Sequence, residues 1–211
     1  MAILTKLGLL EGSEVSFHLN LKESGKSVAT FVEQACTRFP DLANDMNAFM
    51  ATTIFPLRIE DAFSRDSYWD LPAVARHCLW FLVTESNYGP AKPRLPVRRV
   101  TEKSMKALVF GRPFVMVRNP LTLAGLHELG FKSDHRFVDE SYDHILNPRA
   151  RMAAIGETIQ TLSNTPLTRG LLQELRGIAE RNRQWLLDGF GREVISREVR
   201  SFEIAVESAG L

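Results

Sequence analysis

Residues 79–117 constrain the fold more than any other stretch of this chain. Residues 79–83 form a continuous apolar run that ends in polar side chains, which is typical of a strand buried on both faces of a parallel sheet. Thr101 can cap a following helix, which Gly111 is placed to end. Residues 114–117 then form a second apolar run. This order of strand, helix and strand predicts a βαβ unit with a right-handed crossover.

The segment between the first strand and the helix, residues 86–100, contains basic residues and no acidic residue. Three prolines stiffen it, and its cations are Lys92, Arg94, Arg98 and Arg99. It leads from the carboxyl end of a strand to the N-terminus of a helix, where open α/β sheets bind ligands and where an anion is favoured. Two interpretations stay open. One is a phosphate or diphosphate site, with Lys103 as a point charge and an arginine as a bidentate donor. The other is a solvated basic loop.

The charge balance argues against a generally basic nucleic-acid binder. The 211 residues include 26 Lys+Arg and 25 Asp+Glu, a net charge of +1, so any anion site must be local. The two cysteines, Cys36 and Cys78, favour buried thiols in a reducing compartment over a disulfide. We find no signal-peptide pattern, and no apolar run approaches the ~18 residues of a membrane span. We therefore expect a cytoplasmic protein.

The rest of the chain also mixes strand and helix signals. Residues 15–21 alternate between apolar and polar side chains and predict a strand, and residues 24–27 predict a turn. Phe131 is expected in a short strand, and residues 52–72 read as connections. Helices are expected over 28–35, from Pro40, from Asn119-Pro120 to Gly130, from Asn147-Pro148 to about 162, and over 168–187, with a helical or frayed end over 190–211. The predicted class is α/β, with a Rossmann-like, mostly parallel sheet flanked by helices and a helical C-terminal tail.

Three further motifs give weaker signals. Gly25-Lys26-Ser27 lies between a predicted strand and a helix, as a phosphate-binding P-loop would, but Asn20 stands where the first glycine should be. A plain turn is therefore the favoured interpretation. The five histidines lack metal-ligand spacing, so we expect no metal site. The acidic run 139–143 could hold a ribose hydroxyl or a cation, although such a run is more often a solvated loop that caps the next helix.

Three sequence elements resemble the nucleotide-sugar region of fucosyltransferase-like glycosyltransferases. They are the apolar strand ending in Glu85-Ser86-Asn87, the Thr101-Glu102-Lys103 helix start, and the helix, glycine, proline and apolar strand of residues 107–115. A group of mostly uncharacterised bacterial and phage proteins is more similar still. These combine a Thr-Glu-Lys helix with a Leu-x-x-Leu-Gly-Phe segment, here Leu126 to Phe131, and with an Asp-Glu-Ser-Tyr-Asp element, here Asp139 to Asp143. The resemblance extends from about residue 79 to residue 162.

This resemblance implies the nucleotide-binding half of a GT-B glycosyltransferase that uses no essential metal or other cofactor. It implies that Glu102 binds the ribose hydroxyls and that Lys103, next to the cap Thr101, binds the diphosphate. Glu85, Ser86 and Asn87 would line the base or sugar pocket. Arg98 or Arg99 would add a second phosphate contact, which is inferred from charge alone. The default donor is GDP-fucose, although the order Ser86-Asn87 inverts the usual motif. No catalytic residue is identified.

The position of the first predicted strand adds an expectation about domains. Only about fourteen residues precede it, which is too few for the acceptor domain of a GT-B enzyme. The sequence thus predicts a nucleotide-sugar-binding domain over residues 1–165, with C-terminal helices over 166–211 packed on it. The chain would be a fragment, would work with a separate acceptor domain or partner chain, or would bind a nucleoside-diphosphate sugar without transferring it. A structural or interaction protein that keeps the fold is the alternative.

Overall fold

The computed structural model describes residues 1–11, 27–52, 78–84, 102–133, 138–193, 196 and 199–200, excluding the side chain of Glu102. The chain divides into two compact units. Unit 1 comprises Met1–Cys78 and Met152–Gln160, and unit 2 comprises Leu79–Arg151 and Thr161–Leu211. The described residues form a mixed α/β structure that is mostly helical and has a small parallel sheet of two strands.

Unit 1 is built from short helices, namely α1 (Ala2–Lys6), α3 (Val28–Arg38), η1 (Pro40–Leu42), α4 (Ala43–Thr52) and the middle of α7 (Pro148–Asn164). The predicted helices at residues 28 and 40 are thereby confirmed. Ser27 caps α3, because its hydroxyl accepts a hydrogen bond of 3.1 Å from the Thr30 amide. Among the described residues of this unit, Phe49 of α4 is the largest fully buried apolar side chain. Cys36 and Cys78 are half-buried, and neither is part of a disulfide.

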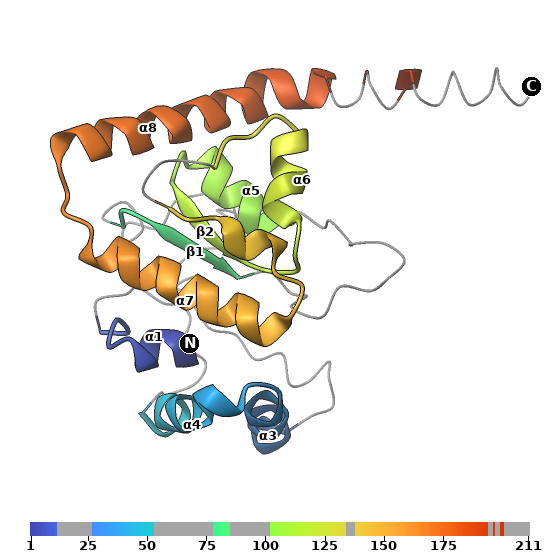
Figure 1. Cartoon of the computed structure of the whole chain (residues 1–211). Coiled ribbons are helices and arrows are strands. Elements are labelled where there is room, and N and C mark those ends of the chain that lie inside the picture. Colours follow the sequence, from blue (N-terminus) through green and yellow to red (C-terminus); the bar gives the residue numbers. More distant parts are fainter. Residues whose placement is uncertain are drawn as a thin grey trace, which may run out of the picture. The chain divides into compact units, whose positions relative to one another are not determined.

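Unit 2 contains the predicted βαβ segment. Strands β1 (Phe81–Thr84) and β2 (Phe114–Val117) pair in parallel, with Phe81 opposite Phe114 and Thr84 opposite Val117. Helix α5 (Glu102–Val109) lies between them in sequence and packs on β1 (Figure 1). The three elements and the parallel pairing confirm the strand, helix and strand order predicted from residues 79–117, whereas the right-handed crossover stays a prediction. The larger Rossmann-like sheet is not present among the described residues.

Glycines end two helices of unit 2 by the same mechanism. Gly111 has φ +61° and follows α5; its amide donates to the Leu108 carbonyl, and the next amide donates to the Ala107 carbonyl. Gly130 has φ +89° and ends α6 (Thr122–Glu128) in the same way. The left-handed conformation is open to glycine without a steric penalty, and it lets two terminal carbonyls find donors. Both predicted helix ends are therefore confirmed.

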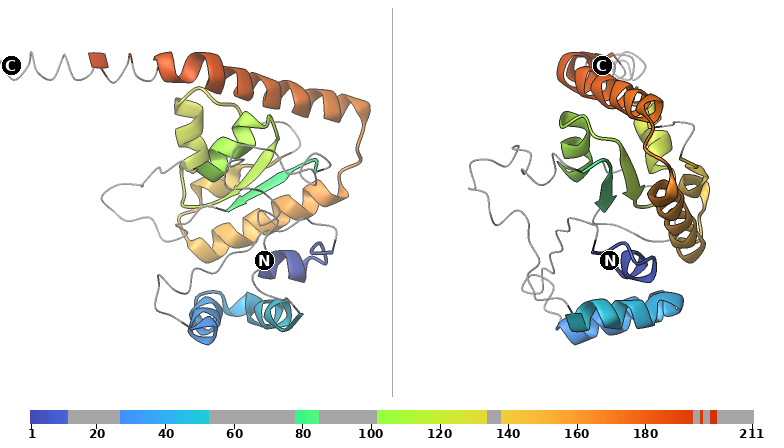
Figure 2. Two further views of the ribbon diagram at one scale, coloured as in Figure 1. Left: turned by 180° about the vertical axis from the view of Figure 1, so that it is seen from behind. Right: turned by 90° about the vertical axis from the view of Figure 1, so that its left-hand side faces the viewer.

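The remaining elements of unit 2 are η5 (Ser141–His144), the ends of α7, α8 (Arg169–Gln184) and the π-helical turn η6 (Trp185–Phe190). Helix α7 begins after Asn147 as the sequence predicted, and the Asn147 side chain accepts hydrogen bonds from the Arg149 and Ala150 amides. Helix α8 also begins where it was predicted, and Thr168 caps it by accepting a hydrogen bond from the Leu171 amide. Helix α8 packs on α5, along one side of unit 2 (Figures 1 and 2). Its buried face consists of Leu171, Leu175, Ala179 and Asn182.

Two sequence predictions in unit 2 are wrong. Asn119 does not cap α6, which begins three residues later at Thr122 because a carboxylate from another segment caps it. Phe131 belongs to no strand; it is a buried residue in the irregular segment after Gly130, and its ring lies 5.4 Å from that of Phe190. The predicted strand 15–21, the turn residues 24–26 and the segments 53–72 and 201–211 lie outside the described residues. No helix in the described part is long and apolar enough to cross a bilayer.

Candidate functional site

The predicted nucleotide-site residues are only partly covered by the structure. Glu85, Ser86, Asn87, Arg98, Arg99 and Thr101 lie outside the described residues. Glu102 is the first residue of α5, as the predicted helix start requires. Lys103 follows it in the first turn of α5, and its side chain is exposed. Whether the whole set meets at one site therefore stays a prediction.

Helix α5 has the length and direction that bring its N-terminus to the carboxyl edge of the sheet. Its eight residues span about 12 Å, and each four-residue strand spans about 13 Å. Its C-terminus connects through only residues 110–113 to the start of β2. Because α5 ends at the amino edge of β2 and packs along β1, its first turn lies near the carboxyl ends of both strands.

One face of α5 is buried, and Lys103 lies outside this face. Ser104, Ala107 and Leu108 are almost fully buried, whereas Lys103 is exposed. The small side chains at positions 104 and 107 allow the helix to approach its neighbours closely. The exposed residue Lys103 thus lies at the N-terminal end of the helix, where the helix dipole also attracts anions.

The turn after β2, residues 118–121, lies at the same carboxyl edge and is held by Asp143 from η5. The Asp143 carboxylate accepts hydrogen bonds from the amides of Thr122 at 2.9 Å and Ala124 at 3.0 Å. Its main-chain carbonyl accepts a third from the Leu121 amide at 2.7 Å. Asp143 is buried. The carboxylate therefore occupies the N-terminus of α6 that a bound anion would otherwise need.

Two more buried side chains fasten this region. The hydroxyl of Tyr142 accepts a hydrogen bond of 3.3 Å from the Met116 amide in β2. The guanidinium of Arg151, in the first turn of α7, donates through Nε to the Arg118 carbonyl at 2.9 Å. Through Nη1 it donates to the Ile145 carbonyl at 2.6 Å and more weakly to that of Leu146. These bonds tie the end of β2 and its turn to the segment around η5.

Burial of Tyr142 predicts a loss of stability in alkali. Burial, more than any other cause, raises the pKa of its phenol above the ordinary value of 10.0. Because the folded pKa lies above the unfolded one, the phenol's contribution is complete below pH 10 and is lost as the pH rises beyond it. We expect the wild type to lose about 1.4 kcal/mol more than Tyr142→Phe between pH 8 and pH 11, measured by urea unfolding. At pH 8 the variant should be about 1 kcal/mol less stable, because the Met116 amide loses its acceptor. If the free energy of unfolding fell equally with pH in the wild type and in Tyr142→Phe, the buried phenol would not be the cause of the loss.

The end of α6 carries a second polar arrangement, in which Ser133 joins a histidine and a carboxylate. The Ser133 hydroxyl donates to Glu140 Oε2 at 3.1 Å, and His127 Nε2 lies 2.5 Å from the same hydroxyl. With the serine proton on the glutamate side, the histidine nitrogen is the donor. The hydroxyl is buried and is satisfied by both neighbours, which accounts for its position.

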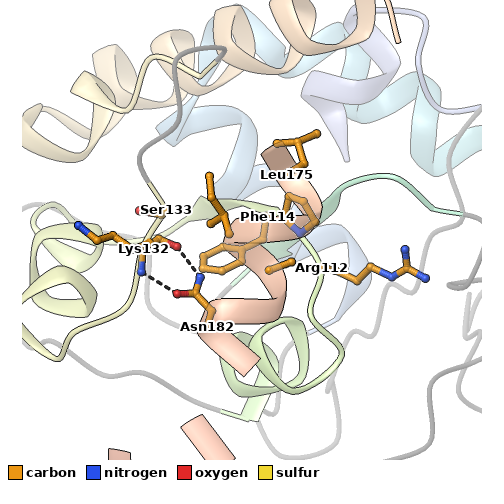
Figure 3. A pocket seen from close by; sticks show the side chains of 9 residues that line it. Arg112, Phe114, Lys132, Ser133, Leu175 and Asn182 are labelled. Carbon is orange, nitrogen blue, oxygen red and sulfur yellow. Dashed lines mark hydrogen bonds between the residues drawn. The ribbon is translucent and has the colours of Figure 1, made fainter. Parts of the chain in front are cut away.

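A small pocket lies beside this arrangement, between the start of β2, residues 132–133 and α8 (Figure 3). Its volume of about 10 Å³ suits a single water molecule. The Asn182 amide is already engaged, because it pairs with both the amide and the carbonyl of Lys132. The charged ends of Arg112 and Lys132 extend away from the pocket in opposite directions (Figure 3). This pocket is a small gap in the packing of α8 and is too small for a nucleotide.

The acidic run 139–143 has a role that the sequence did not indicate. The interpretation as a solvated loop that caps the next helix is wrong for Asp143, which is buried and caps the preceding helix α6. A ribose contact of this run stays a prediction. Asp139 is exposed and accepts from the Ser141 amide. No group of three or more histidine, cysteine or acidic side chains in the described part could hold a metal ion. The sequence did not predict the role of Arg151 either, because nothing in the local pattern distinguishes it from the exposed Arg149.

Comparisons with protein-family models, curated proteins and solved structures gave no match for this chain. Its function is therefore inferred from the geometry of unit 2.

Proposed function

We propose that unit 2 binds a nucleoside-diphosphate sugar at the carboxyl edge of the β1–β2 sheet, as part of a Rossmann-like nucleotide domain. One observation carries the proposal: the first turn of α5, with Lys103 exposed, lies at this edge beside the ends of two parallel strands. Ligands of open α/β sheets bind at the carboxyl ends of the strands, and helix N-termini there favour phosphate. The resemblance to fucosyltransferase-like enzymes makes a sugar nucleotide the favoured ligand.

The two helices that follow the strands differ in how they can receive an anion. The N-terminus of α6 already holds the Asp143 carboxylate, which would repel a diphosphate at that place. The N-terminus of α5 is preceded by the basic segment 86–100 and contains Lys103. The diphosphate is therefore assigned to α5, with Lys103 as its point charge.

The chemistry that such a site supports is departure of a nucleoside diphosphate from a sugar. Negative charge develops on the leaving phosphate oxygen when the bond to the anomeric carbon breaks. A fixed cation and a helix N-terminus stabilise that charge without rearranging, which is commonly the largest catalytic contribution. Transfer also needs an acceptor and a base. Unit 2 itself binds the sugar nucleotide, and glycosyl transfer follows when further residues or a partner chain supply the acceptor site.

Calorimetric titration of the protein with GDP, UDP and their sugars tests the proposal. We expect saturable binding of at least one of them, with the sugar nucleotide and its diphosphate competing for one site. Inorganic sulfate at the same ionic strength serves as the control for unspecific attraction of anions. No binding by any of these nucleotides at millimolar concentration would overturn the proposal and leave the structural or interaction role.

Lys103→Ala should weaken binding of the diphosphate by about 1.5–3 kcal/mol, the usual effect of losing a hydrogen bond to a charged group. The matched control is Lys106→Ala, the same substitution in the last turn of α5, at the opposite end of the helix. Calorimetry with the tightest nucleotide of the wild type measures both. Equal affinities of the wild type and Lys103→Ala would place the diphosphate elsewhere.

A further inference from the structure

The turn between β2 and α6, residues 118–121, lies next to the proposed nucleotide site. The parallel register pairs Thr84 with Val117, the last residues of the two strands. Arg118 therefore leaves the sheet beside the point where the chain leaves β1 toward α5. A ligand at the carboxyl edge of β1 has this turn as its neighbour on one side.

The backbone of this turn contains a strained residue. Leu121 has φ +64° and ψ +21°, the left-handed conformation, which costs a residue with a side chain about 1–2 kcal/mol. It is the one residue other than glycine with positive φ among the described residues. Such a conformation persists only where the surroundings fix it.

Contacts from two other elements fix this conformation. Asp143 of η5 bonds the amides of Leu121, Thr122 and Ala124, and Arg151 of α7 bonds the Arg118 carbonyl. Both side chains are buried charges. The Asp143 carboxylate accepts from amides next to the turn, and Arg151 links the turn, through the Arg118 carbonyl, to the carbonyls of Ile145 and Leu146 after η5. Helix capping alone needs only a local serine or asparagine, and Asn119 was available in the sequence.

We infer that Asp143 and Arg151 are positioning residues, which hold the β2–α6 turn in a strained shape as one wall of the ligand site. The inference rests on the proposed function, because the wall is defined by the nucleotide beside it. A positioning role explains why the carboxylate of Asp143, and not the nearby Asn119, holds this turn. A site that holds its ligand closely needs walls fixed to within about 0.5 Å.

Two variants test the positioning role by different routes. Asp143→Asn removes the charge and one acceptor oxygen that serve Thr122 and Ala124. Leu121→Gly relaxes the strained backbone and deletes none of the hydrogen bonds described above. Each is titrated calorimetrically with GDP, or with the nucleotide that the wild type binds tightest, well below its unfolding midpoint. The matched control is Asp139→Asn, an exposed acid of the same run.

We expect both variants to weaken nucleotide affinity about fivefold or more, with Asp139→Asn unchanged. For Leu121→Gly this loss should occur with an unfolding midpoint no lower than that of the wild type. If both variants bind within twofold of the wild type, the residues are structural and the inference is overturned while the proposed function stands. If the wild type binds no nucleotide, both fall together. If Asp143→Asn does not fold, the affinity of Leu121→Gly alone decides.

Discussion

Replacing Arg151 by methionine should lower the free energy of unfolding by about 3–5 kcal/mol, because three main-chain carbonyls lose the charged donor that they share. The side chain is about 1% exposed, and its guanidinium donates to the carbonyls of Arg118, Ile145 and Leu146. Methionine fills similar volume but offers no donor. The carbonyls would then lose their charged partner, at a cost of about 1–3 kcal/mol for each one that stays buried.

Two other variants separate the causes of this loss. Arg149→Met, two residues earlier on the exposed side of α7, should stay within about 0.5 kcal/mol of the wild type. Arg151→Lys keeps the charge but lacks the planar fork that reaches acceptors in different directions, so it should recover only part of the loss. Urea unfolding followed by circular dichroism measures all three. A loss for Arg151→Met no larger than for Arg149→Met would show that the carbonyls find water instead.

Local signals account for the parts of the fold that the sequence predicted correctly. Ser27, Asn147 and Thr168 cap helices through contacts within three residues, and Gly111 and Gly130 end helices through their own backbone conformation. The βαβ segment follows from two apolar runs and the helix signal between them. In each case the deciding interaction lies within one turn or one strand, so a short stretch of sequence contains it.

The errors occur where a contact distant in sequence decides the outcome. The cap of α6 comes from Asp143, 21 residues after Thr122, and it displaces the local signal of Asn119. Phe131 has the apolar character of a strand residue, but it packs against the ring of Phe190, 59 residues later in the chain, and belongs to no strand. A single sequence does not show which distant segments come into contact. Those contacts decide which residue caps a helix and which residue pairs in a strand.

In the candidate site, too, the features set by local sequence were predicted and those set by distant contacts were not. The start of α5 at Glu102 and its position after a buried strand follow from local pattern, and the structure agrees. The role of the 139–143 run depends on which helix it meets, so it could not be read from composition. The remaining predicted contacts, Glu85 to Asn87 and the arginines at 98 and 99, stay predictions.

The Gly189→Ala substitution should destabilise the protein by about 2–4 kcal/mol, although alanine is the better helix former. A Cβ at position 189 would lie 2.4 Å from Cε3 and 2.5 Å from Cζ3 of the Trp185 ring. The ring cannot yield easily. Its Nε1 donates to the Leu129 carbonyl at 2.9 Å, and its other edge lies against Gly130, where a Cβ would come within 3.0 Å. Displacing the indole gives up this hydrogen bond and the packing of η6 on the end of α6.

The control is Gly177→Ala in α8, where a Cβ would meet no atom within 4 Å. This variant should gain about 0.5–1 kcal/mol, the ordinary preference of a helix for alanine over glycine. Comparing the two glycines by urea unfolding separates the contact with the indole from the change in helix propensity. A gain at both positions would show that the indole moves aside without cost.

A double-mutant cycle with Trp185→Ala makes the same point through a change of sign. Without the indole, the space beside position 189 is free, and Gly189→Ala should change from destabilising to neutral or stabilising by up to about 1 kcal/mol. The coupling energy between the two positions should then be at least about 2 kcal/mol, the upper part of the range for residues in direct contact. Additive effects of the two substitutions would mean that the cost at position 189 arises from the π-helical backbone, which both variants share. The sign change therefore tests whether the packing of the Trp185 indole against Gly130 and Gly189 holds η6 on the end of α6.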